Sequence, residues 1–399
     1  MLSLDYTQNI LGIKDIIITK QEFNSHENQF IFHIEMPLAE QQCPVCNHTT
    51  KRVHDYRKQF IKDIPIQFGI STRLLYRKRR YVCTHCGKRF AEQNTFLPRY
   101  YRMSSKVIAH IVEKLKTTHS IKDLAAELFL SHSTTARFLR ILSPSKPTAL
   151  PTILSIDEFK GNSGGEKFHC ILTNPSKKKV LDILPSRTLR DLTEYFTAFE
   201  LKEREQVQYF VMDMYKPYRV LAGTVFPNAK IIADPFHVIR QCMWSMENVR
   251  KRIQKDLPPH LRKFFKRSRW ILLSDSSKLR GQEDILAQRD TMFSLSDELG
   301  QAYYLKEHFM KIWNASTRNE AKFLLDGWIV AAKNSGIEEF KSSITAFTNW
   351  HTEILNAIEF RHSNGFTEGT NNKIKVIKRN AYGYRNFTHF RTRILLCTN

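Results

Sequence analysis

The sequence predicts a multidomain α+β protein, and three features of the chain lead to this prediction. Two Cys-x-x-Cys pairs lie among alternating strands in a basic N-terminal stretch. Further along, short apolar strands end repeatedly in an aspartate. Residues 236–360 form an almost wholly helical stretch that contains all five tryptophans. A chain of 399 residues, at roughly 150 residues per domain, is long enough for two or three domains.

Composition narrows the class of protein. Hydrophobic residues make up 42% of the chain, which excludes a disordered protein. The net charge of +23 indicates a polyanionic partner, although an acidic lipid surface or simple solubility would also account for it. No run of 18 apolar residues is present, so we expect no membrane span. Residues 1–10 lack the pattern of a secretion signal, so we expect a cytoplasmic protein.

Residues 1–102 are predicted to form an N-terminal region of strands with a basic edge. Apolar residues alternate with polar ones over 13–37, as in two half-buried strands. Residues 51–102 carry an excess of eleven positive charges, and they include the run Arg77, Lys78, Arg79 and Arg80. This run predicts contact with a phosphate backbone, and a solvated strand face is the simpler alternative.

Two cysteine pairs predict a zinc-ribbon-like module in the same region. Thirty-six residues separate the pairs, which consist of Cys43, Cys46, Cys83 and Cys86. Two such pairs supply four thiolates, the closed tetrahedral set that structural Zn²⁺ prefers. Two unrelated buried pairs are the alternative. Nearby histidines that could replace one ligand are His48, His54 and His85.

Residues 103–143 are predicted to form a helix-turn-helix that binds DNA. Ser120 begins a short amphipathic helix, residues 130–132 form the turn, and residues 133–140 form the second helix. The second helix carries residues suited to a DNA groove, namely Ser133, Thr134, Thr135 and Arg137. Three packed helices without a role in DNA binding are the alternative. Pro144 and Pro147 mark the beginning of a linker, for which we expect residues 144–151.

Three apolar strands are followed by a carboxylate. These carboxylates belong to Asp157, Asp213 and Asp234. Carboxylates at the ends of adjacent strands can hold divalent cations a few ångströms apart. The alternative is that each aspartate caps the helix that follows it. This alternative applies most strongly to Asp234, because Pro235 suits the first position of a helix.

A basic helix near the C-terminus adds another carboxylate. If this helix begins at Glu368, one of its faces carries Glu368, Asn372, Lys375 and Arg379. Residues 367–393 contain seven Lys and Arg but only Glu368 as an acid, so most of these cations lack acidic partners in the segment. The helix therefore predicts a metal-binding carboxylate beside a surface for phosphates, with an ordinary solvated face as the alternative.

Taken in order, these motifs resemble those of the bacterial insertion-sequence transposases of the ISL-three family. The resemblance rests on the cysteine pairs, the predicted helix-turn-helix, and the segments 156–159, 233–237, 363–369 and 378–393. It covers essentially the whole chain. It implies a ribonuclease-H-like catalytic domain over 152–396, interrupted by a helical insertion at about 236–360.

The resemblance also implies an activity. A D-D-E triad at Asp157, Asp213 and Glu368 would hold Mg²⁺ or Mn²⁺ for a two-metal reaction. Asp213 is preferred to Asp234 because it ends the more continuous strand. The implied reaction is DNA strand cleavage by water, followed by attack of the freed 3′-hydroxyl on target DNA. Cations expected to follow the DNA near the cut are Lys373, Lys375, Lys378, Arg379 and Arg385.

The implied partner is double-stranded DNA, both the terminal inverted repeats of the element and the target. The zinc module and the helix-turn-helix would recognise the repeats, and a homodimer or higher oligomer associated with the nucleoid is expected. One alternative is a DNA-binding regulator whose transposase-like domain is inactive. A tyrosine recombinase is another, with Tyr382 or Tyr384 as nucleophile beside Arg361, His362 and Arg385, but it leaves the strand-end aspartates unexplained.

Overall fold

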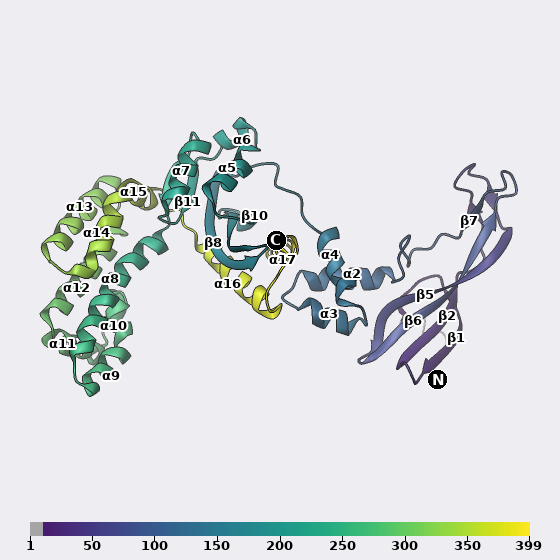
Figure 1. Cartoon of the computed structure of the whole chain (residues 1–399), viewed down its shortest axis with the longest axis horizontal. Helices are drawn as coiled ribbons and strands as arrows, with labels where there is room; N and C mark the ends of the chain where they lie inside the picture. Colours follow the sequence, from purple (N-terminus) through teal and green to yellow (C-terminus); the bar gives the residue numbers. More distant parts are fainter. Residues whose placement is uncertain (1–10) are drawn as a thin grey trace. The chain divides into compact units, whose positions relative to one another are not determined.

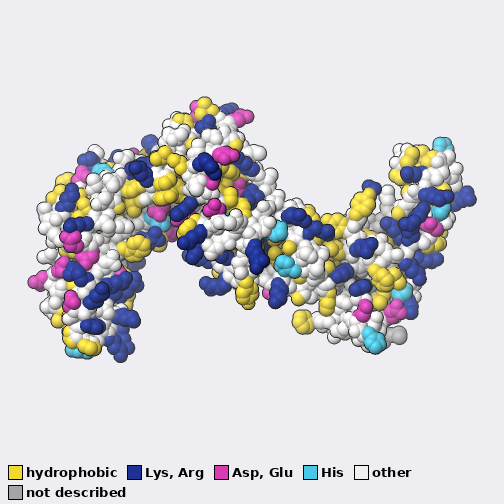
Figure 2. Space-filling model, in the orientation of Figure 1, with side chains coloured by type: hydrophobic (Ala, Val, Ile, Leu, Met, Phe, Trp, Pro, Cys, Tyr) yellow, Lys and Arg dark blue, Asp and Glu magenta, His cyan; other side chains and the backbone are white. Residues whose placement is uncertain are grey.

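The computed structural model describes residues 11–399, which form two compact units (Figure 1). Unit 1 contains the described residues up to Pro144 together with Val376–Thr398, and unit 2 contains Ser145–Lys375 and Asn399. The family resemblance places residues 376–396 in the catalytic domain, and in the structure Val376–Thr398 pack with unit 1. No helix in the described part of the chain is long and apolar enough to cross a membrane. Figure 2 shows many more basic than acidic side chains on the face it presents, as the net charge of +23 requires.

Unit 1 begins with a sheet in the order β1-β2-β6-β5, with β7 paired to β6. Its first two strands form the antiparallel hairpin expected from the alternating residues of 13–37. The apolar face of the sheet packs around Phe32, Ile34 and Leu74. A separate pair of two-residue strands, β3 and β4, borders the first cysteine pair. The strands are β1 (Ile17–Asn24), β2 (Gln29–Glu35), β3 (Gln41–Gln42), β4 (Thr49–Thr50), β5 (Val53–Gln67), β6 (Ile70–Val82) and β7 (Arg89–Ala91).

Three short helices follow in unit 1, and a C-terminal helix packs on them. The serines that precede the three helices accept hydrogen bonds from backbone N–H groups, so each helix is capped. In the C-terminal helix, Arg393 is buried and donates to the carbonyls of Leu115 (2.8 Å) and His119. Its charge is tolerated because its donors are satisfied. The helices are α2 (Ser105–Leu115), α3 (Ile121–Glu127), α4 (His132–Ile141) and α17 (Phe387–Thr398).

Unit 2 is built on a five-stranded sheet in the order β10-β9-β8-β11-β12. The pairs β10–β9 and β9–β8 are antiparallel, and the pairs β8–β11 and β11–β12 are parallel. The three parallel strands therefore run toward the same edge of the sheet. The strands are β8 (Ile153–Ser163), β9 (Glu166–Asn174), β10 (Lys179–Leu184), β11 (Tyr209–Met212) and β12 (Lys230–Ala233), and the helices between them are α5 (Leu189–Thr197), α6 (Leu201–Glu205) and α7 (Lys216–Val225).

From residue 235 to residue 360, all described elements are helical, as the sequence predicts (Figure 1). Trp328 lies at the centre of this helical part, fully buried, with its indole N–H bonded to the carbonyl of Leu305. The last helix returns to the sheet, where Ala357 packs with Val211 and Ile232. The elements are α8 (Pro235–Asp256), α9 (Pro259–Arg267), α10 (Arg269–Leu273), η1 (Ser276–Leu279), α11 (Glu283–Ser294), α12 (Asp297–Ile312), α13 (Arg318–Asn334), η2 (Glu338–Phe340), α14 (Lys341–Asn349) and α15 (His351–Phe360), and α16 (Gly365–Asn380) follows.

Candidate functional site

The register of the parallel strands places the three aspartates side by side where β11 and β12 end, with Asp157 within the longer β8. Val211 of β11 pairs with Ser155 of β8, and Met212 pairs with Ala233 of β12. Following this register beyond the paired residues brings Asp157, Asp213 and Asp234 next to one another. Neighbouring strands lie about 4.8 Å apart, so the three carboxylates are crowded.

Asp157 is buried within this cluster. Its carboxylate accepts hydrogen bonds from the backbone N–H of Glu158 (2.7 Å) and from the side-chain amide of Asn371 (2.8 Å). Burial raises the pKa of Asp157 to about 6, and the charges of Asp213 and Asp234 act in the same direction. A cation bound among these carboxylates would relieve this repulsion.

Glu368 lies in the first turn of α16, and buried hydrogen bonds hold this turn on the sheet. The hydroxyl of Thr367 lies 3.0 Å from that of Ser155 in β8 and 2.8 Å from that of Thr173 in β9. Ser155 also donates to the side-chain carbonyl of Asn364. One turn is thus fixed to two strands, which determines where the Glu368 carboxylate lies.

The Glu368 carboxylate has an oxygen without a partner. Its Oε1 atom is buried and accepts no hydrogen bond from any described residue. Burial raises the pKa of Glu368, and the charges of Asp234 and Asp157 raise it further. A buried carboxylate oxygen without a donor is costly, and a metal ion is the kind of partner that would satisfy it.

Asp234 occupies the position before α8, but it does not cap that helix. Its side chain makes no capping hydrogen bond. One oxygen accepts from the backbone N–H of Asn364 (2.8 Å), and the other lies 3.0 Å from Nδ1 of His237. The helix-cap interpretation of Asp234 is therefore wrong: this fully buried carboxylate ties the chain before α16 to α8.

His237 links Asp234 to Asp213. Its Nε2 atom lies 3.6 Å from the Asp213 carboxylate, on the side of the ring opposite Asp234. Burial lowers the pKa of His237, but the hydrogen bond with Asp234 and the charge of Asp213 outweigh burial, so the pKa is raised. Ligand atoms of Asp234, His237 and Glu368 all lie within 4.8 Å of one another, so the residues that could hold a metal include a histidine.

The sequence did not single out four of the polar residues that support this site. All four are buried: Ser155 lies on β8, Asn364 lies just before α16, and Thr367 and Asn371 lie in the first two turns of α16. The signal was present, because residues 364, 367 and 371 recur at helical spacing. Polar residues at positions where a helix packs on a sheet indicate a built site rather than a plain core.

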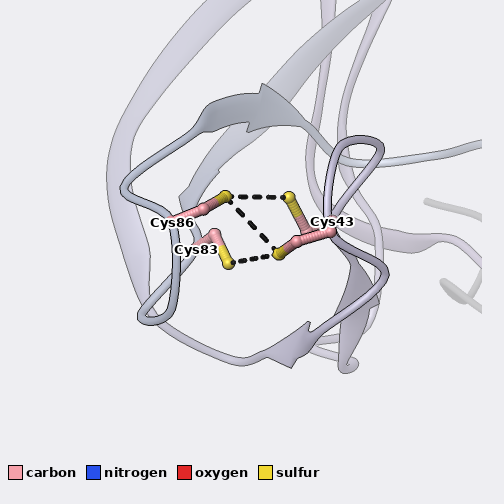
Figure 3. Close-up of side chains that lie close together, drawn as sticks. Cys43, Cys83 and Cys86 are labelled. Atoms are coloured by element: carbon pink, nitrogen blue, oxygen red, sulfur yellow. Dashed lines mark hydrogen bonds between the residues drawn. The ribbon is translucent and has the colours of Figure 1, made fainter.

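The four predicted zinc ligands come together in unit 1 (Figure 3). Their sulfur atoms are 3.6 Å apart between Cys43 and Cys86, and 3.5 Å apart between Cys46 and each of Cys83 and Cys86. A Zn–S bond of about 2.3 Å in a tetrahedron corresponds to sulfur atoms about 3.8 Å apart. The four thiols therefore fit a zinc ion, and no histidine belongs to this group among the described residues.

The two cysteine pairs have the same backbone geometry. Cys43 donates its N–H to the carbonyl of His48 (3.0 Å), and Cys83 donates its N–H to that of Lys88 (2.9 Å). A residue with positive φ follows the second cysteine of each pair, Asn47 at 58° and Gly87 at 71°. Burial raises the pKa of Cys43, but N–H groups of its own loop outweigh it and lower that pKa to about 7. These N–H groups favour the thiolate of Cys43, the form that a metal requires.

The cations of the basic run of β6 differ in their surroundings. Arg77 is exposed and stacks on the ring of Tyr56, 3.9 Å from its centre. A basic hollow on the sheet is lined by Lys78 and Arg80, together with Arg57, Lys58 and Arg102, and no acidic residue lines it among the described residues. These residues remain candidates for phosphate contact.

Two residues predicted to contact DNA are instead buried. Arg79 is 5% exposed and forms ion pairs with Glu92 (3.4 Å) and Glu35 (3.6 Å). Thr135 is fully buried, and its hydroxyl donates to the carbonyl of Ser131. The predictions for Arg79 and Thr135 are therefore wrong. The other predicted DNA contacts are exposed or partly exposed: Ser133, Thr134 and Arg137 on α4, Lys373, Lys375, Lys378 and Arg379 on α16, and Arg385 after it.

The tyrosine alternative finds little support in the structure. Tyr384 stacks on Phe390 with ring centres 4.6 Å apart, and burial raises its pKa to about 12. A nucleophile needs a lowered pKa or an adjacent base. Arg361 donates to the carbonyls of Trp313 and Ala315 instead of lying free for a phosphate.

Comparisons with known proteins agree with this picture. A family model for transposases, DDE_Tnp_ISL3, matches residues 154–394, and a model described as the zinc-finger of transposase IS204/IS1001/IS1096/IS1165 matches residues 39–86. The chain is 25% identical over 357 residues to the transposase for insertion sequence element IS1001 of Bordetella parapertussis, covering 87% of this chain and 86% of that protein. A segment of 59 residues is 42% identical to an ATP-dependent protease of Lactococcus lactis subsp. lactis, which covers only 15% of this chain and 19% of that protein.

Proposed function

Because the chain belongs to the ISL-three family of DDE transposases, we propose that it moves its own insertion sequence by cutting and joining DNA. It would bind the terminal inverted repeats, cleave a strand in the presence of Mg²⁺ or Mn²⁺, and join the freed 3′-hydroxyl to target DNA. The observation that carries this proposal is the alignment of Asp157 and Asp213 on parallel strands, with Glu368 held over the same edge. We read the sheet order β10-β9-β8-β11-β12 as a ribonuclease-H-like arrangement.

Asp157, Asp213 and Glu368 would hold the catalytic cations. Bound Mg²⁺ or Mn²⁺ supplies Lewis-acid activation of the attacking oxygen and stabilises charge on the phosphate. The chain itself orients the carboxylates. The Glu158 N–H and Asn371 fix Asp157, and the Met214 N–H (2.6 Å) fixes Asp213. Beyond Glu368, the exposed Lys373 and Lys375 of α16 would contact DNA phosphates.

Asp213 suits the second position better than Asp234 does. The Asp213 side chain is 37% exposed, and it accepts a hydrogen bond from the adjacent Met214 N–H. Asp234 is 1% exposed, and both of its oxygens already have protein partners. Asp157 also has a protein partner on each oxygen, so the criterion between Asp213 and Asp234 is access: the side chain of Asp213 is open to an incoming ion, whereas that of Asp234 is closed off. We therefore assign Asp213 to the metal, and Asp234 with His237 to positioning.

Unit 1 is proposed to recognise DNA. The exposed Ser133 and Arg137 of α4 would read the major groove as the second helix of a helix-turn-helix. The hollow around Lys78 and Arg80 would bind phosphates, and one Zn²⁺ on the four cysteines would hold the module folded. A homodimer or higher oligomer would bring the two element ends together.

The test is cleavage of a plasmid that carries the gene and its flanking DNA. We expect Mg²⁺-dependent nicking at the element ends, and a fall of roughly a thousand-fold or more in Asp157→Asn, Asp213→Asn and Glu368→Gln. DNA binding should survive in all three variants. Asp290→Asn, at an exposed carboxylate on α11, is the matched control and should cleave normally.

Two outcomes would favour other functions. Binding of the element ends by the wild-type protein without any cleavage would indicate the regulator with an inactive domain. Normal cleavage by all three triad variants would exclude the D-D-E mechanism, and Tyr384→Phe would then test the tyrosine alternative.

A further inference from the structure

Unit 1 contains a large pocket to which no role has been assigned as a pocket, although Arg379 and Arg385 in its lining are predicted to contact DNA. Its volume is about 1050 Å³, and it is lined by residues 118–123 before and within α3, by His132 and Ala136 of α4, by residues 379–386 at the end of α16 and in the turn after it, and by His389 of α17. Two segments of unit 1 that lie more than two hundred residues apart in the sequence therefore build one pocket. A volume of this size matches the largest sites for small ligands. It has room for a nucleotide or two but not for a duplex.

The walls of the pocket are held together by defined contacts. Asn380 donates to the carbonyl of Thr118 (2.9 Å), and Arg393 of α17 donates to the carbonyl of Leu115 at the end of α2 (2.8 Å). The thiol of Cys397 donates to the carbonyl of Thr117 (3.1 Å). The α16–α17 turn is thus attached to the α2–α3 turn at several points, so the pocket is a built feature of unit 1.

The lining is suited to an anion. It includes the cations Lys122, Arg379 and Arg385, and Asp123 is the only acidic residue that lines it among the described residues. His389 also lines the pocket, and its buried Nε2 atom has no hydrogen-bond partner in the described part of the chain. Burial lowers the pKa of His389, and the nearby charge of Arg140 acts in the same direction. A ligand with phosphate oxygens and hydrogen-bonding groups would satisfy these side chains.

An aromatic ring completes this lining. Tyr382 is fully exposed, and its backbone has a positive φ of 52°. Tyr384, two residues later, instead packs inside on Phe390. A fully exposed ring in a turn whose other tyrosine is buried contributes nothing to the core of unit 1. Sites that bind single-stranded nucleic acid combine cations along the sugar-phosphate backbone with aromatic rings on which bases stack.

We propose that this pocket binds unpaired nucleotides of DNA, with the phosphates on Arg379, Arg385 and Lys122 and a base stacked on Tyr382. This inference rests on the proposed function, because it takes DNA as the substrate of the protein. It adds that unit 1 holds a strand that has left the duplex, next to the α4 surface proposed to read the duplex. The C-terminal turn would then be part of the DNA-binding unit.

The experiment compares two DNA hairpins of the same sequence, one blunt and one with a four-nucleotide dT tail at either the 3′ or the 5′ end. Binding to the full-length protein is measured without divalent cations, so that cleavage plays no part. We expect the wild type to bind a tailed hairpin about tenfold more tightly than the blunt one. Tyr382→Ala should reduce this preference to less than twofold without changing affinity for the blunt hairpin, and Tyr382→Phe should keep it because the ring remains.

Two further variants make the test specific. Arg385→Ala should weaken binding of the tailed hairpin and make its salt dependence shallower. Tyr100→Ala is the matched control, because Tyr100 is also an exposed tyrosine of unit 1 with positive φ (67°) beside an arginine but lies outside the pocket. It should keep the wild-type preference for the tail.

The outcomes separate this proposal from the proposed function. Tight and equal binding of both hairpins by the wild type, or a preference that survives in Tyr382→Ala, would overturn the pocket proposal and leave the transposase proposal intact. Both hairpins carry the element-end sequence, so failure of the wild type to bind either of them would overturn both proposals.

Discussion

Replacing Asp234 with asparagine should destabilise unit 2, whereas the same change at Asp213 should not. The two aspartates are neighbours at the same edge of the sheet, and the substitution is chemically identical. They differ in what surrounds them. Asp234 is buried: one of its oxygens accepts a hydrogen bond from the backbone N–H of Asn364, and the other faces the ring of His237. The side chain of Asp213, in contrast, is 37% exposed.

The magnitude follows from the contacts. In the Asp234→Asn variant, the new side chain would keep an acceptor for the Asn364 N–H but would place an amide N–H₂ or a neutral oxygen against the His237 ring. A hydrogen bond with a charged partner contributes about 1.5–3 kcal/mol, so we expect the free energy of unfolding to fall by about 2–3 kcal/mol. For a unit of this size, this corresponds to a fall of roughly 4–12 °C in Tm. Asp213→Asn removes a like charge from the cluster and should leave Tm unchanged or slightly raised.

The assay measures thermal unfolding on metal-free protein, and plasmid nicking after Mg²⁺ is added to the same preparations. We expect Asp213→Asn to melt like the wild type and to be inactive. We expect Asp234→Asn to melt earlier and to keep part of its activity at low temperature, because it positions Asp213 through His237 rather than binding the metal. An unchanged Tm in Asp234→Asn would refute the reasoning from burial. Normal nicking by Asp213→Asn together with an inactive but fully stable Asp234→Asn would reverse the two assignments.

Three further predictions follow from unit 1. Elemental analysis should find about one zinc per chain, and Cys43→Ser should lose the metal and unfold the N-terminal module, whereas a folded zinc-free protein would exclude a structural role. Arg79→Ala should lower the free energy of unfolding of unit 1 by about 3 kcal/mol in urea, because Glu92 would lose its buried partner. Arg77→Ala should leave that stability unchanged. It should instead reduce the slope of log affinity for DNA against log salt concentration by about one. Arg137→Ala should weaken binding to the element end more than binding to random DNA, as measured by competition, and equal losses on both would show that α4 does not read sequence.

Local patterns in the sequence predicted the elements of this protein well. The alternation over 13–37 predicts the β1–β2 hairpin, and Ser120 and the apolar spacing predict α3 and its cap. These features depend on neighbours a few residues apart, so the sequence contains the information directly. The four zinc ligands were also identified from spacing, because each Cys-x-x-Cys loop orients both of its thiols by itself.

The tertiary structure decided which side chains of those elements are available. Alternation along a strand places Arg77 and Arg79 on the same face, yet Arg77 is exposed and Arg79 is buried, so the run from Arg77 to Arg80 does not itself show which cation is covered. Glu35 and Glu92, distant in sequence, hold Arg79 inside, and this pairing exists only after the strands align. A charge pattern shows how many cations a segment has but not how many of them find acidic partners.

The residue pattern predicted that a carboxylate follows each of three apolar strands and that a basic helix begins at Glu368. In the structure Asp213 and Asp234 follow β11 and β12, but Asp157 lies within β8 and α16 begins at Gly365, so that Glu368 lies in its first turn. The residue pattern could not determine how these residues divide the work, because that depends on contacts between segments more than a hundred residues apart. The Asn364 N–H takes one oxygen of Asp234, and Thr367 and Asn364 fix the start of α16 on β8. Likewise, only packing shows that α17 completes the core of unit 1, since a buried Arg393 paired with the carbonyls of Leu115 and His119 has no signature in its own segment. Burial and hydrogen bonding between distant segments are properties of the folded chain, and they separate residues that look alike in the sequence.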